Sequence, residues 1–226
     1  IIEQKCALLL LEANGAINLK KNRKFIYLLS PSKLNNNFFI DLKKILSTNK
    51  ITFFQLRLKN QSMRKSLEIA KKVKKICKKF NVKFIINDDP KLVKKINADG
   101  CHLGQKDMNL SNARKILKKK IIGVTCHNSI KLVKKATKEG ADYVALGSFF
   151  KSKTKKNAIR ADIKIINKAK RISKLPLVCI GGINYENYKR LLLHKPNFLA
   201  ISGYIWNNSK LSPLEAIKSL NYENKC

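Results

Sequence analysis

The chain has 226 residues, with 49 lysines and arginines against 14 aspartates and glutamates, so its formal net charge is +35. This length fits one compact domain with a large core. The charge suggests a nucleic-acid partner, but only 7 of the 49 basic residues are Arg and no recognition motif accompanies them. We therefore interpret the lysines as a solvated surface that favours a small polyanionic substrate, and we expect no specific nucleic-acid partner.

Residues 1–24 are predicted to form a short helical extension ahead of the main domain. The apolar stretch within it, 6–11, is far too short to span a membrane. No signal-peptide cleavage pattern follows that stretch. We therefore expect no association with a membrane.

From residue 25 onward, strand and helix patterns alternate to the end of the chain. Short runs of β-branched, aliphatic and aromatic residues predict buried parallel strands. These strands are expected at 25–29, 52–58, 83–87, 100–103, 121–125, 143–147, 177–181 and 198–202. Helical spacing of apolar residues is found at 39–46, 64–80, 90–96, 111–117, 130–139, 162–173, 184–194 and 213–220.

Eight strand–helix units are the number that closes a (β/α)₈ TIM barrel. We predict one such α/β barrel over 25–226, with residues 1–24 as its N-terminal extension. The alternative is an open, doubly wound sheet. It is disfavoured because no G-x-G-x-x-G motif follows the first strand.

Six cysteines occur without a C-x-x-C pair or a zinc-like spacing: Cys6, Cys77, Cys101, Cys126, Cys179 and Cys226. Several of them lie inside strand patterns, where a free cysteine behaves as a small apolar residue. This usage suits a reducing compartment, so we expect a cytoplasmic protein. The sequence is also compatible with a homo-oligomer.

Polar residues at the strand ends are the candidates for chemistry, because loops at the carboxyl ends of barrel strands surround the ligand. Asp88 follows the third strand and Asp107 lies just beyond the fourth. Two carboxylates without a cysteine or a histidine cluster suit Mg²⁺, which takes one or two carboxylates together with phosphate oxygens. The alternative is that Asp88 and Asp107 cap the two helices that follow them.

The end of the second strand carries two cations. Gln55, Arg57 and Lys59 alternate with leucines, so period two places all three on one strand face. In a barrel that face points inward, where two cations imply an anionic ligand. The alternative is a frayed strand end with solvated charges.

Two segments suggest phosphate binding at the other side of the barrel mouth. Ser152, Thr154 and Lys155 lie in a lysine-rich loop after the sixth strand, which is a weak signal in this chain. Gly181-Gly182 and Ser202-Gly203 follow the seventh and eighth strands. The loops after those strands form the common barrel phosphate site, although an ordinary turn also explains the glycines.

Histidines give a less specific signal. His102 lies within a strand and faces either the core or the pocket, and His127 ends the fifth strand, where it could orient a ligand. No Ser-His-Asp order or nucleophile elbow is present. Together, the candidates describe a substrate bound through its pyrophosphate and Mg²⁺ beside a second, phosphorylated substrate, and a transfer with pyrophosphate as leaving group.

With these residues in view, the chain resembles the thiamine-phosphate synthase family from about residue 25 to 206. The matching segments occur in the family's order, and no single one would suffice: FFQLRLK, NDDP, ADGCHLGQKD, IIGVTCHNS, GADYVALGSFF, SKTKK, LVCIGGI and LAISGYIW. The resemblance implies a (β/α)₈ barrel that joins a hydroxymethylpyrimidine diphosphate to a thiazole phosphate. The implied products are thiamine phosphate and pyrophosphate.

The resemblance also implies a role for each matching residue. Mg²⁺ would be held by Asp88 and Asp107, and the pyrimidine by Gln55 and Thr125. The diphosphate would be bound by Arg57, Lys59, Asn87 and Lys155, of which Arg57, Lys59 and Lys155 would be the catalytic cations. The thiazole phosphate would be bound by Ser152, Thr154, Gly182, Ile201 and Ser202.

Two other functions are alternatives to this reaction. A thiazole-phosphate isomerase, or tautomerase, occurs on the same barrel but has no need of the diphosphate-binding residues. A basic nucleic-acid-binding protein that retains an inactive barrel is the alternative of another class; salt-dependent binding to DNA at a defined stoichiometry would favour it.

Overall fold

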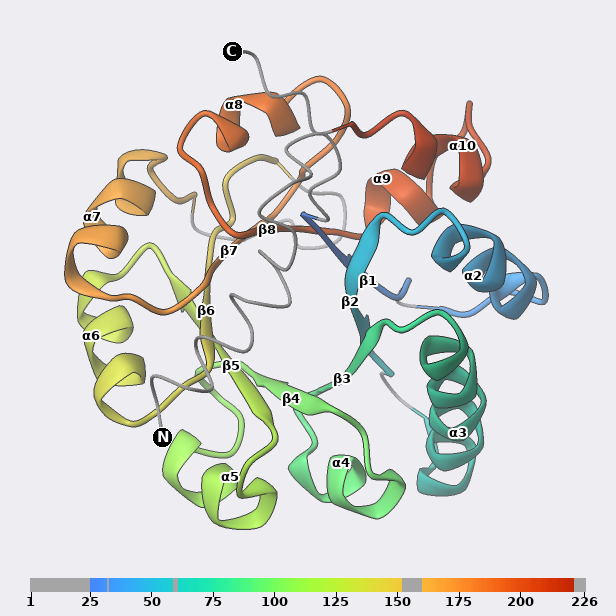
Figure 1. Ribbon diagram of the computed structural model, residues 1–226, viewed down its shortest axis with the longest axis horizontal. Coiled ribbons are helices and arrows are strands. Elements are labelled where there is room, and N and C mark those ends of the chain that lie inside the picture. The colour runs from blue at the N-terminus through green and yellow to red at the C-terminus, as the bar shows by residue number, and fades with distance from the viewer. Residues whose placement is uncertain (1–24, 32, 59–60, 152–159, 222–226) are drawn as a thin grey trace.

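The structure is a computed structural model that describes residues 25–31, 33–58, 61–151 and 160–221 (Figure 1). The predicted extension, 1–24, lies outside the described residues. Within the described part, eight strands close into a parallel barrel in which each strand pairs with its neighbours in the sequence and β1 pairs with β8. The prediction of a (β/α)₈ barrel is confirmed, and the doubly wound alternative is wrong because the sheet has no open edge.

The strands follow the predicted positions closely. They are β1 (Ile26–Leu29), β2 (Ile51–Leu56), β3 (Lys83–Asn87), β4 (Gly100–Leu103), β5 (Ile121–His127), β6 (Tyr143–Leu146), β7 (Leu177–Ile180) and β8 (Phe198–Ile201). Two differ from expectation by more than one residue: β2 ends two residues early, and β5 continues to His127. The pairing of β5 with β6 is irregular between Thr125 and His127, which lets β5 run on past the predicted end.

Helices surround the barrel on its outer side (Figure 1). They are α2 (Phe38–Leu46), α3 (Met63–Lys79), α4 (Pro90–Ile96), α5 (Leu110–Leu117), α6 (Ile130–Lys138), α7 (Lys164–Ile172), α8 (Tyr188–Leu192), α9 (Gly203–Trp206) and α10 (Pro213–Lys218). The α8 helix is shorter than predicted, and α9 was not expected. A four-residue helix is too short to show a period in the sequence, which explains that omission.

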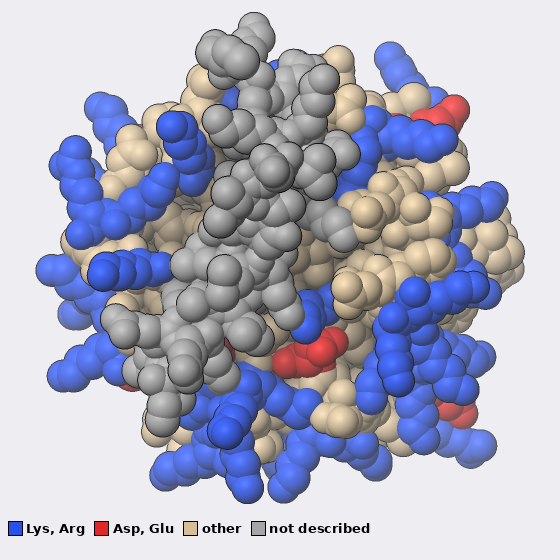
Figure 2. Space-filling view, viewed as in Figure 1, with Lys and Arg blue, Asp and Glu red and all other residues tan. Residues whose placement is uncertain are grey.

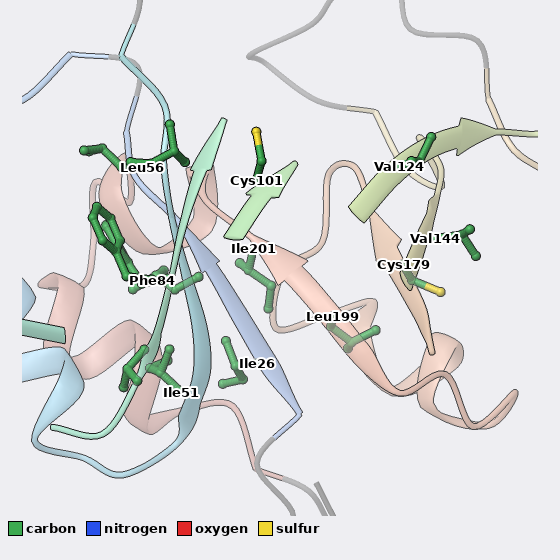
Figure 3. Close-up of a cluster of buried hydrophobic side chains, with 14 of the residues drawn as sticks. Ile26, Ile51, Leu56, Phe84, Cys101, Val124, Val144, Cys179, Leu199 and Ile201 are labelled. Atoms are coloured by element: carbon green, nitrogen blue, oxygen red, sulfur yellow. The ribbon is translucent and has the colours of Figure 1, made fainter. Parts of the chain in front are cut away.

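Alternate strand residues face opposite sides of the barrel wall and form two separate clusters. The outward set packs under the helices, and Figure 3 shows part of it, including Ile26, Phe84 and Leu199. The inward set fills the barrel with aromatic and small side chains: Tyr27, Leu29, Phe53, Ile85, Tyr143, Ala145, Val178, Phe198 and Ala200. The interior is therefore packed, and a ligand site belongs at its mouth.

The basic side chains lie on the outside. In α3, Ala70, Val73, Ile76 and Cys77 are buried, whereas Lys71, Lys72, Lys75, Lys78 and Lys79 are exposed. Figure 2 shows lysine and arginine side chains projecting all round the ring of helices. This distribution agrees with the interpretation of the lysines as a solvated surface.

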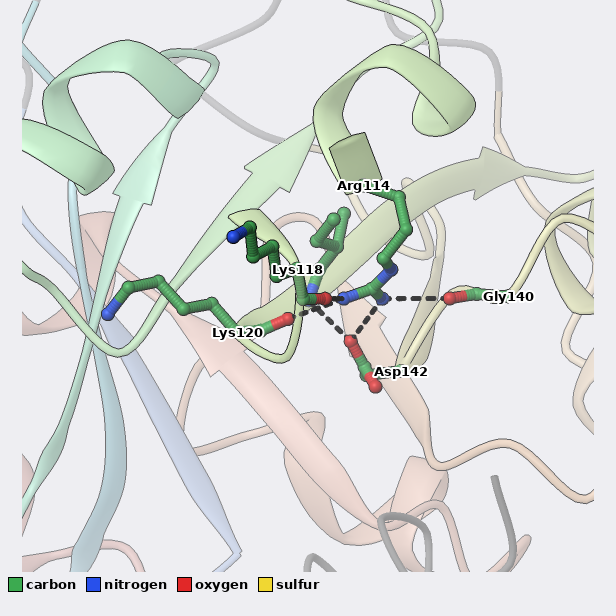
Figure 4. A network of polar contacts seen from close by, with 6 residues as sticks. Arg114, Lys118, Lys120, Gly140 and Asp142 are labelled. Atoms are coloured by element: carbon green, nitrogen blue, oxygen red, sulfur yellow. Dashed lines mark hydrogen bonds and ion pairs between the residues drawn. The ribbon is translucent and has the colours of Figure 1, made fainter. Parts of the chain in front are cut away.

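One polar network joins the segments at the start of β5 and β6 (Figure 4). The Arg114 guanidinium donates to the backbone oxygens of Lys118, Lys120 and Gly140, at 2.7–2.8 Å, and forms a 2.6 Å ion pair with Asp142. The same carboxylate oxygen of Asp142 accepts from the Ile122 amide at 2.7 Å. The network fixes helix and strand ends at the side of the barrel away from the predicted site.

Across the described ranges, every helix is either too short or too polar to cross a bilayer. The four cysteines in those ranges, Cys77, Cys101, Cys126 and Cys179, are buried and unpaired. Burial raises the pKa of each of these thiols, so they are unreactive apolar fillers of the core.

Candidate active site

The two predicted metal ligands meet at the carboxyl ends of β3 and β4. Asp88 has a left-handed backbone conformation (φ +64°), and its amide donates to the His102 carbonyl at 2.8 Å. The side chain of Asp107 lies close enough to raise the pKa of the Asp88 carboxyl group. The structure therefore brings together two acidic groups that are 19 positions apart in the sequence.

The environment of Asp88 changes its acidity. The residue is exposed at the rim, yet partial burial of its carboxyl group, followed by the hydrogen bond and charge of Asp107, raises its pKa to about 6. The charge of Arg57 and a hydrogen bond from Asn87 act in the opposite direction. The charge of Asp107 disfavours ionisation of Asp88, and a divalent cation would relieve this repulsion.

The alternative that these two aspartates cap helices is wrong. The α4 cap is Asp89, whose carboxylate accepts from the Leu92 amide at 2.9 Å, and the α5 cap is Asn109, which accepts from the Asn112 amide at 2.9 Å. Asp107 has a different local role, because it accepts from the Gly104 amide at 2.6 Å. That bond fixes the β4–α5 loop and orients the Asp107 carboxylate.

The end of β2 is held in place beyond its last paired residue. Ser30 donates its amide to the Gln55 carbonyl at 2.8 Å, and its hydroxyl accepts from the Arg57 amide at 2.9 Å. Arg57 is half-buried, and its charge acts on Asp88. The alternative of a frayed strand end is therefore not supported for Arg57, whereas Lys59 lies outside the described residues.

The predicted pyrimidine contacts, Gln55 and Thr125, come from β2 and β5. Gln55 is buried and donates to the Tyr27 hydroxyl at 2.9 Å. Thr125 is half-buried and its hydroxyl lies 2.8 Å from His102 Nε2. The Gln105 side chain donates to the Thr125 carbonyl at 2.5 Å, so the β4–α5 loop reaches over the end of β5.

The glycines after β7 have a packing role of their own. Gly182 has φ +63°, and a Cβ there would lie 2.2 Å from the Lys151 carbonyl oxygen. Gly181 has φ +107°, and its Cβ would lie 2.0 Å from the Ser148 hydroxyl oxygen. Close contact between the loops after β6 and β7 thus requires both glycines. The predicted phosphate role of Gly182 stays a separate prediction.

The remaining predicted phosphate residues follow β8 and β6. Ile201 ends β8 with its side chain in the outer core, and Ser202 precedes α9 and donates its hydroxyl to the Ser30 carbonyl at 3.1 Å. The backbone after β8 is therefore tied to the segment after β1. Ser152, Thr154 and Lys155 lie outside the described residues, so their predicted roles stay predictions.

Sequence reasoning missed two tyrosines. Tyr27 and Tyr143 lie inside the barrel, and their hydroxyl groups are 2.7 Å apart. His102, left undecided between core and pocket, is buried and bonded to both Tyr143 and Thr125. The available signal was a tyrosine at an inward strand position beside a strand glycine, Gly123, but recognising it requires the strand register.

The donor set fits Mg²⁺ better than a transition metal. Within the described ranges, no group of three or more His, Cys, Asp or Glu side chains is placed to hold an ion. Mg²⁺ needs only one or two carboxylates when substrate phosphates and water complete its shell. Asp88 and Asp107, whose side chains lie close together, match that requirement.

Three comparisons with known proteins point to the same family. A model of the family described as thiamine monophosphate synthase matches residues 26–205. A thiamine-phosphate synthase of Pelagibacter ubique is 62% identical over 202 residues, which cover 89% of this chain and 98% of the relative. The thiamine-phosphate synthase of Erythrobacter litoralis is 35% identical over 196 residues, covering 84% and 92%.

Among solved structures, a thiamine phosphate pyrophosphorylase from Pyrococcus furiosus superimposes with a TM-score of 0.79 at 26% identity, covering 88% of this chain and 94% of that one. A 3-hexulose-6-phosphate synthase from Salmonella typhimurium gives a TM-score of 0.63 at 14% identity, covering 86% and 95%. The second likeness shows the fold alone.

Proposed function

The chain belongs to the thiamine monophosphate synthase family, and we infer that it is an enzyme that forms thiamine phosphate. Its substrates are 4-amino-2-methyl-5-hydroxymethylpyrimidine diphosphate and 4-methyl-5-(2-hydroxyethyl)thiazole phosphate, and pyrophosphate is released. The family match over residues 26–205 and the high identity to a thiamine-phosphate synthase support this function. We further propose that it acts on these small molecules in the cytoplasm.

The observation that carries the site assignment is the cluster at the ends of β2, β3 and β4. Asn87, Asp107 and Arg57 all act on the carboxyl group of Asp88. An amide, two carboxyl groups and a guanidinium so close together are suited to a diphosphate and its metal ion. We propose that the pyrimidine diphosphate binds there.

Mg²⁺ fits this cluster, with Asp88 and Asp107 as its protein ligands. When bound, it supplies positive charge that neutralises the diphosphate. Arg57 is held half-buried by its backbone bond to Ser30, so its guanidinium is available to the same anion. Lys59 and Lys155 are proposed to add further positive charge to the departing diphosphate, on the family's pattern.

The chemistry proposed is a dissociative transfer. The aminopyrimidine ring delocalises the positive charge left on its methylene carbon when the diphosphate departs, so no protein nucleophile is needed. Cations that act on charge growing at the leaving group stabilise the transition state more than the bound substrate. Arg57, Lys59 and Lys155 are therefore proposed as the catalytic residues.

The thiazole phosphate is proposed to bind across the mouth. Gly182, Ile201 and Ser202 would contribute backbone groups, while Ser152 and Thr154 would contribute hydroxyl groups. Holding both phosphorylated ends would keep the thiazole nitrogen near the methylene carbon, which favours attack by proximity.

The two other functions are not favoured. A thiazole tautomerase has no need of a diphosphate site, yet Arg57, Asn87, Asp88 and Asp107 form one cluster in this chain. A nucleic-acid-binding role would rest on the basic surface alone, which follows the outer helices rather than a recognition motif.

A direct test is to incubate the purified chain with both substrates and Mg²⁺ and to quantify thiamine phosphate and pyrophosphate. We expect equal amounts of the two products, and none when either substrate is omitted or Mg²⁺ is chelated. Conversion of a thiazole phosphate isomer without pyrophosphate release would favour the tautomerase. Absence of both reactions, together with saturable DNA binding, would favour the nucleic-acid function.

A further inference from the structure

A chain of hydrogen bonds crosses the interior of the barrel. Gln55 Nε2 lies 2.9 Å from the Tyr27 hydroxyl, which lies 2.7 Å from the Tyr143 hydroxyl. Tyr143 lies 2.9 Å from His102 Nδ1, and His102 Nε2 lies 2.8 Å from the Thr125 hydroxyl. Five side chains from five different strands thus form one continuous connection between Gln55 and Thr125, the two predicted pyrimidine contacts.

These polar groups lie deep inside the barrel, where apolar side chains are usual. Tyr27, Tyr143, Gln55 and His102 are exposed by 1%, 2%, 3% and 7%, at a depth where barrels mostly contain branched aliphatic residues. Burying polar groups destabilises a protein unless each one is hydrogen-bonded. In the described ranges, no buried side-chain nitrogen or oxygen lacks a partner. These hydrogen-bonded side chains therefore form a satisfied network, which holds its members rigidly in place.

The neighbouring residues hold the chain in one arrangement. A Cβ on Gly123 would lie 1.9 Å from Cζ of Tyr143, so the glycine of β5 makes room for that ring. The Tyr143 ring also packs edge-on against Tyr27, with centroids 5.8 Å apart, and stacks on His102 at 5.6 Å. The hydroxyl groups therefore have little freedom to choose other partners.

Each hydroxyl has a single proton, and a buried O–H group needs an acceptor. In the described ranges, the Tyr27 hydroxyl has Gln55 and Tyr143 as its partners, and the Tyr143 hydroxyl has Tyr27 and His102. Both protons therefore find an acceptor only when the bonds run in one direction. With the Gln55 amide nitrogen as donor, Tyr27 donates to Tyr143, and Tyr143 donates to Nδ1 of His102. The imidazole then carries its proton on Nε2 and donates it to Thr125. Burial raises the pKa of both phenols above the usual range, so each tyrosine keeps its proton.

This direction gives the two ends opposite hydrogen-bonding character. Gln55 keeps its Oε1 atom as an acceptor, and Thr125, which has accepted from His102, keeps its own proton to donate. A neutral 4-aminopyrimidine offers the matching pair, an amino group that donates beside a ring nitrogen that accepts. A 4-oxopyrimidine offers the reverse pair, an accepting oxygen beside a donating ring nitrogen, which the Gln55 Oε1 atom and the Thr125 proton do not match.

We propose that Tyr27, Tyr143 and His102 are positioning residues that fix the polarity of Gln55 and Thr125, and so select an aminopyrimidine over an oxopyrimidine. The proposal rests on the proposed function, because it takes the pyrimidine diphosphate as the ligand of this site. Tyr27, Tyr143 and His102 would act through Gln55 and Thr125, because only these two ends of the hydrogen-bonded network are assigned to the substrate.

The test compares Tyr27→Phe and Tyr143→Phe with the wild type. Each variant removes one hydroxyl and retains the ring. We expect the KM for the aminopyrimidine diphosphate to rise about tenfold, in line with the loss of a buried hydrogen bond, while the Kd for thiazole phosphate changes less than about twofold. Preference for the amino substrate over the 4-oxo analogue, measured as a ratio of inhibition or turnover, should fall by about tenfold or more.

Tyr188→Phe is the matched control. Tyr188 is equally buried and its hydroxyl donates to the Asn221 carbonyl at 3.1 Å, on an outer helix. It should lose stability comparably and keep the amino preference of the wild type. A general structural effect would instead lower the preference in all three variants, and that result would overturn the proposal.

A second measurement does not depend on activity. Nitrogen NMR of histidine-labelled protein, with His102 identified by comparison with His102→Asn, should show a proton on Nε2 and none on Nδ1 in the wild type. A proton on Nδ1 would reverse the chain and overturn the proposal. If the wild type makes thiamine phosphate but the tyrosine variants keep its preference for the amino substrate, this inference fails and the proposed function stands. If the wild type binds neither pyrimidine, the proposed function itself has failed.

Discussion

The side chain of Asp107 lies close enough to that of Asp88 to change its acidity at the mouth of the barrel, although the two residues follow different strands. Partial burial of the carboxyl group, followed by the influence of Asp107, raises the pKa of Asp88 to about 6, from an ordinary value of 3.8. Because the folded pKa is the higher one, the shift contributes stability below about pH 4 that is lost as the pH rises through about 6. Repulsion between the two carboxyl groups is therefore strongest at neutral pH, where a bound divalent cation would reduce it.

The first prediction concerns the pH dependence of metal binding. Mg²⁺ must compete with the proton that Asp88 binds below about pH 6, so its affinity should rise as the pH increases from about 5 to about 7. Calorimetric titration with Mg²⁺ at several pH values, in the presence of pyrophosphate, measures this. In Asp107→Asn the pKa of Asp88 should return toward its ordinary value, and the rise in affinity should shift to lower pH. An affinity that is independent of pH in the wild type would contradict the prediction.

The second prediction concerns Asp107→Ala. The variant should lose Mg²⁺-dependent turnover while keeping its fold, because a carboxylate at the rim contributes little core packing. Loss of the 2.6 Å bond from the Gly104 amide should lower the free energy of unfolding by about 1–2 kcal/mol. Turnover at limiting Mg²⁺ and thermal unfolding are the two measurements.

Asp89→Ala is the control for Asp107→Ala. Asp89 caps α4, so its removal should cost about 1 kcal/mol of stability. Turnover at limiting Mg²⁺ should stay close to that of the wild type. If Asp107→Ala behaves like this cap variant, with stability reduced and turnover retained, the metal role of Asp107 is wrong.

The third prediction concerns Lys59, which lies outside the described residues. Lys59→Ala should lower turnover at saturating substrate by about 10²-fold or more, similar to the loss of an oxyanion donor, because its charge acts on the departing diphosphate. Binding of thiazole phosphate, measured by calorimetry, should weaken by less than about tenfold. Lys91→Ala, at an exposed position of α4, is a control that removes the same charge elsewhere. A large loss of thiazole phosphate affinity with turnover preserved would place Lys59 on the wrong phosphate.

The fourth prediction concerns the Arg114 network, which is remote from the site. Arg114→Met leaves the carboxylate of Asp142, only 9% exposed, without its ion pair. Stability should fall by about 3 kcal/mol, the lower end of the range for breaking a buried pair, while KM values stay unchanged. Arg64→Met removes an exposed pair of 3.7 Å and should cost less than about 1 kcal/mol. Equal effects in chemical denaturation would mean that the network contributes no more than a surface contact.

The sequence by itself determined the number of strands and their order, and it predicted which end of the barrel carries the active site. Each of these depends on local information: a run such as 83–87 is apolar because it is buried, and polar residues such as Asp88 follow where the strand leaves the core. The face on which a strand residue lies also follows from the local period, so Gln55 was placed on the inward face correctly. The family resemblance, carried by short ordered segments, supplied the reaction.

Only the tertiary structure decided which of several chemically equivalent residues fills each role. Asp88 and Asp89 are adjacent residues of the same type, yet they have different roles. Asp89 caps α4, whereas Asp88, with its left-handed backbone, lies beside Asp107. The interior chain depends on Tyr27 and Tyr143, which are 116 positions apart. Hydrogen bonds depend on distances of a few tenths of an ångström, and only closure of the barrel brings such distant groups within that range.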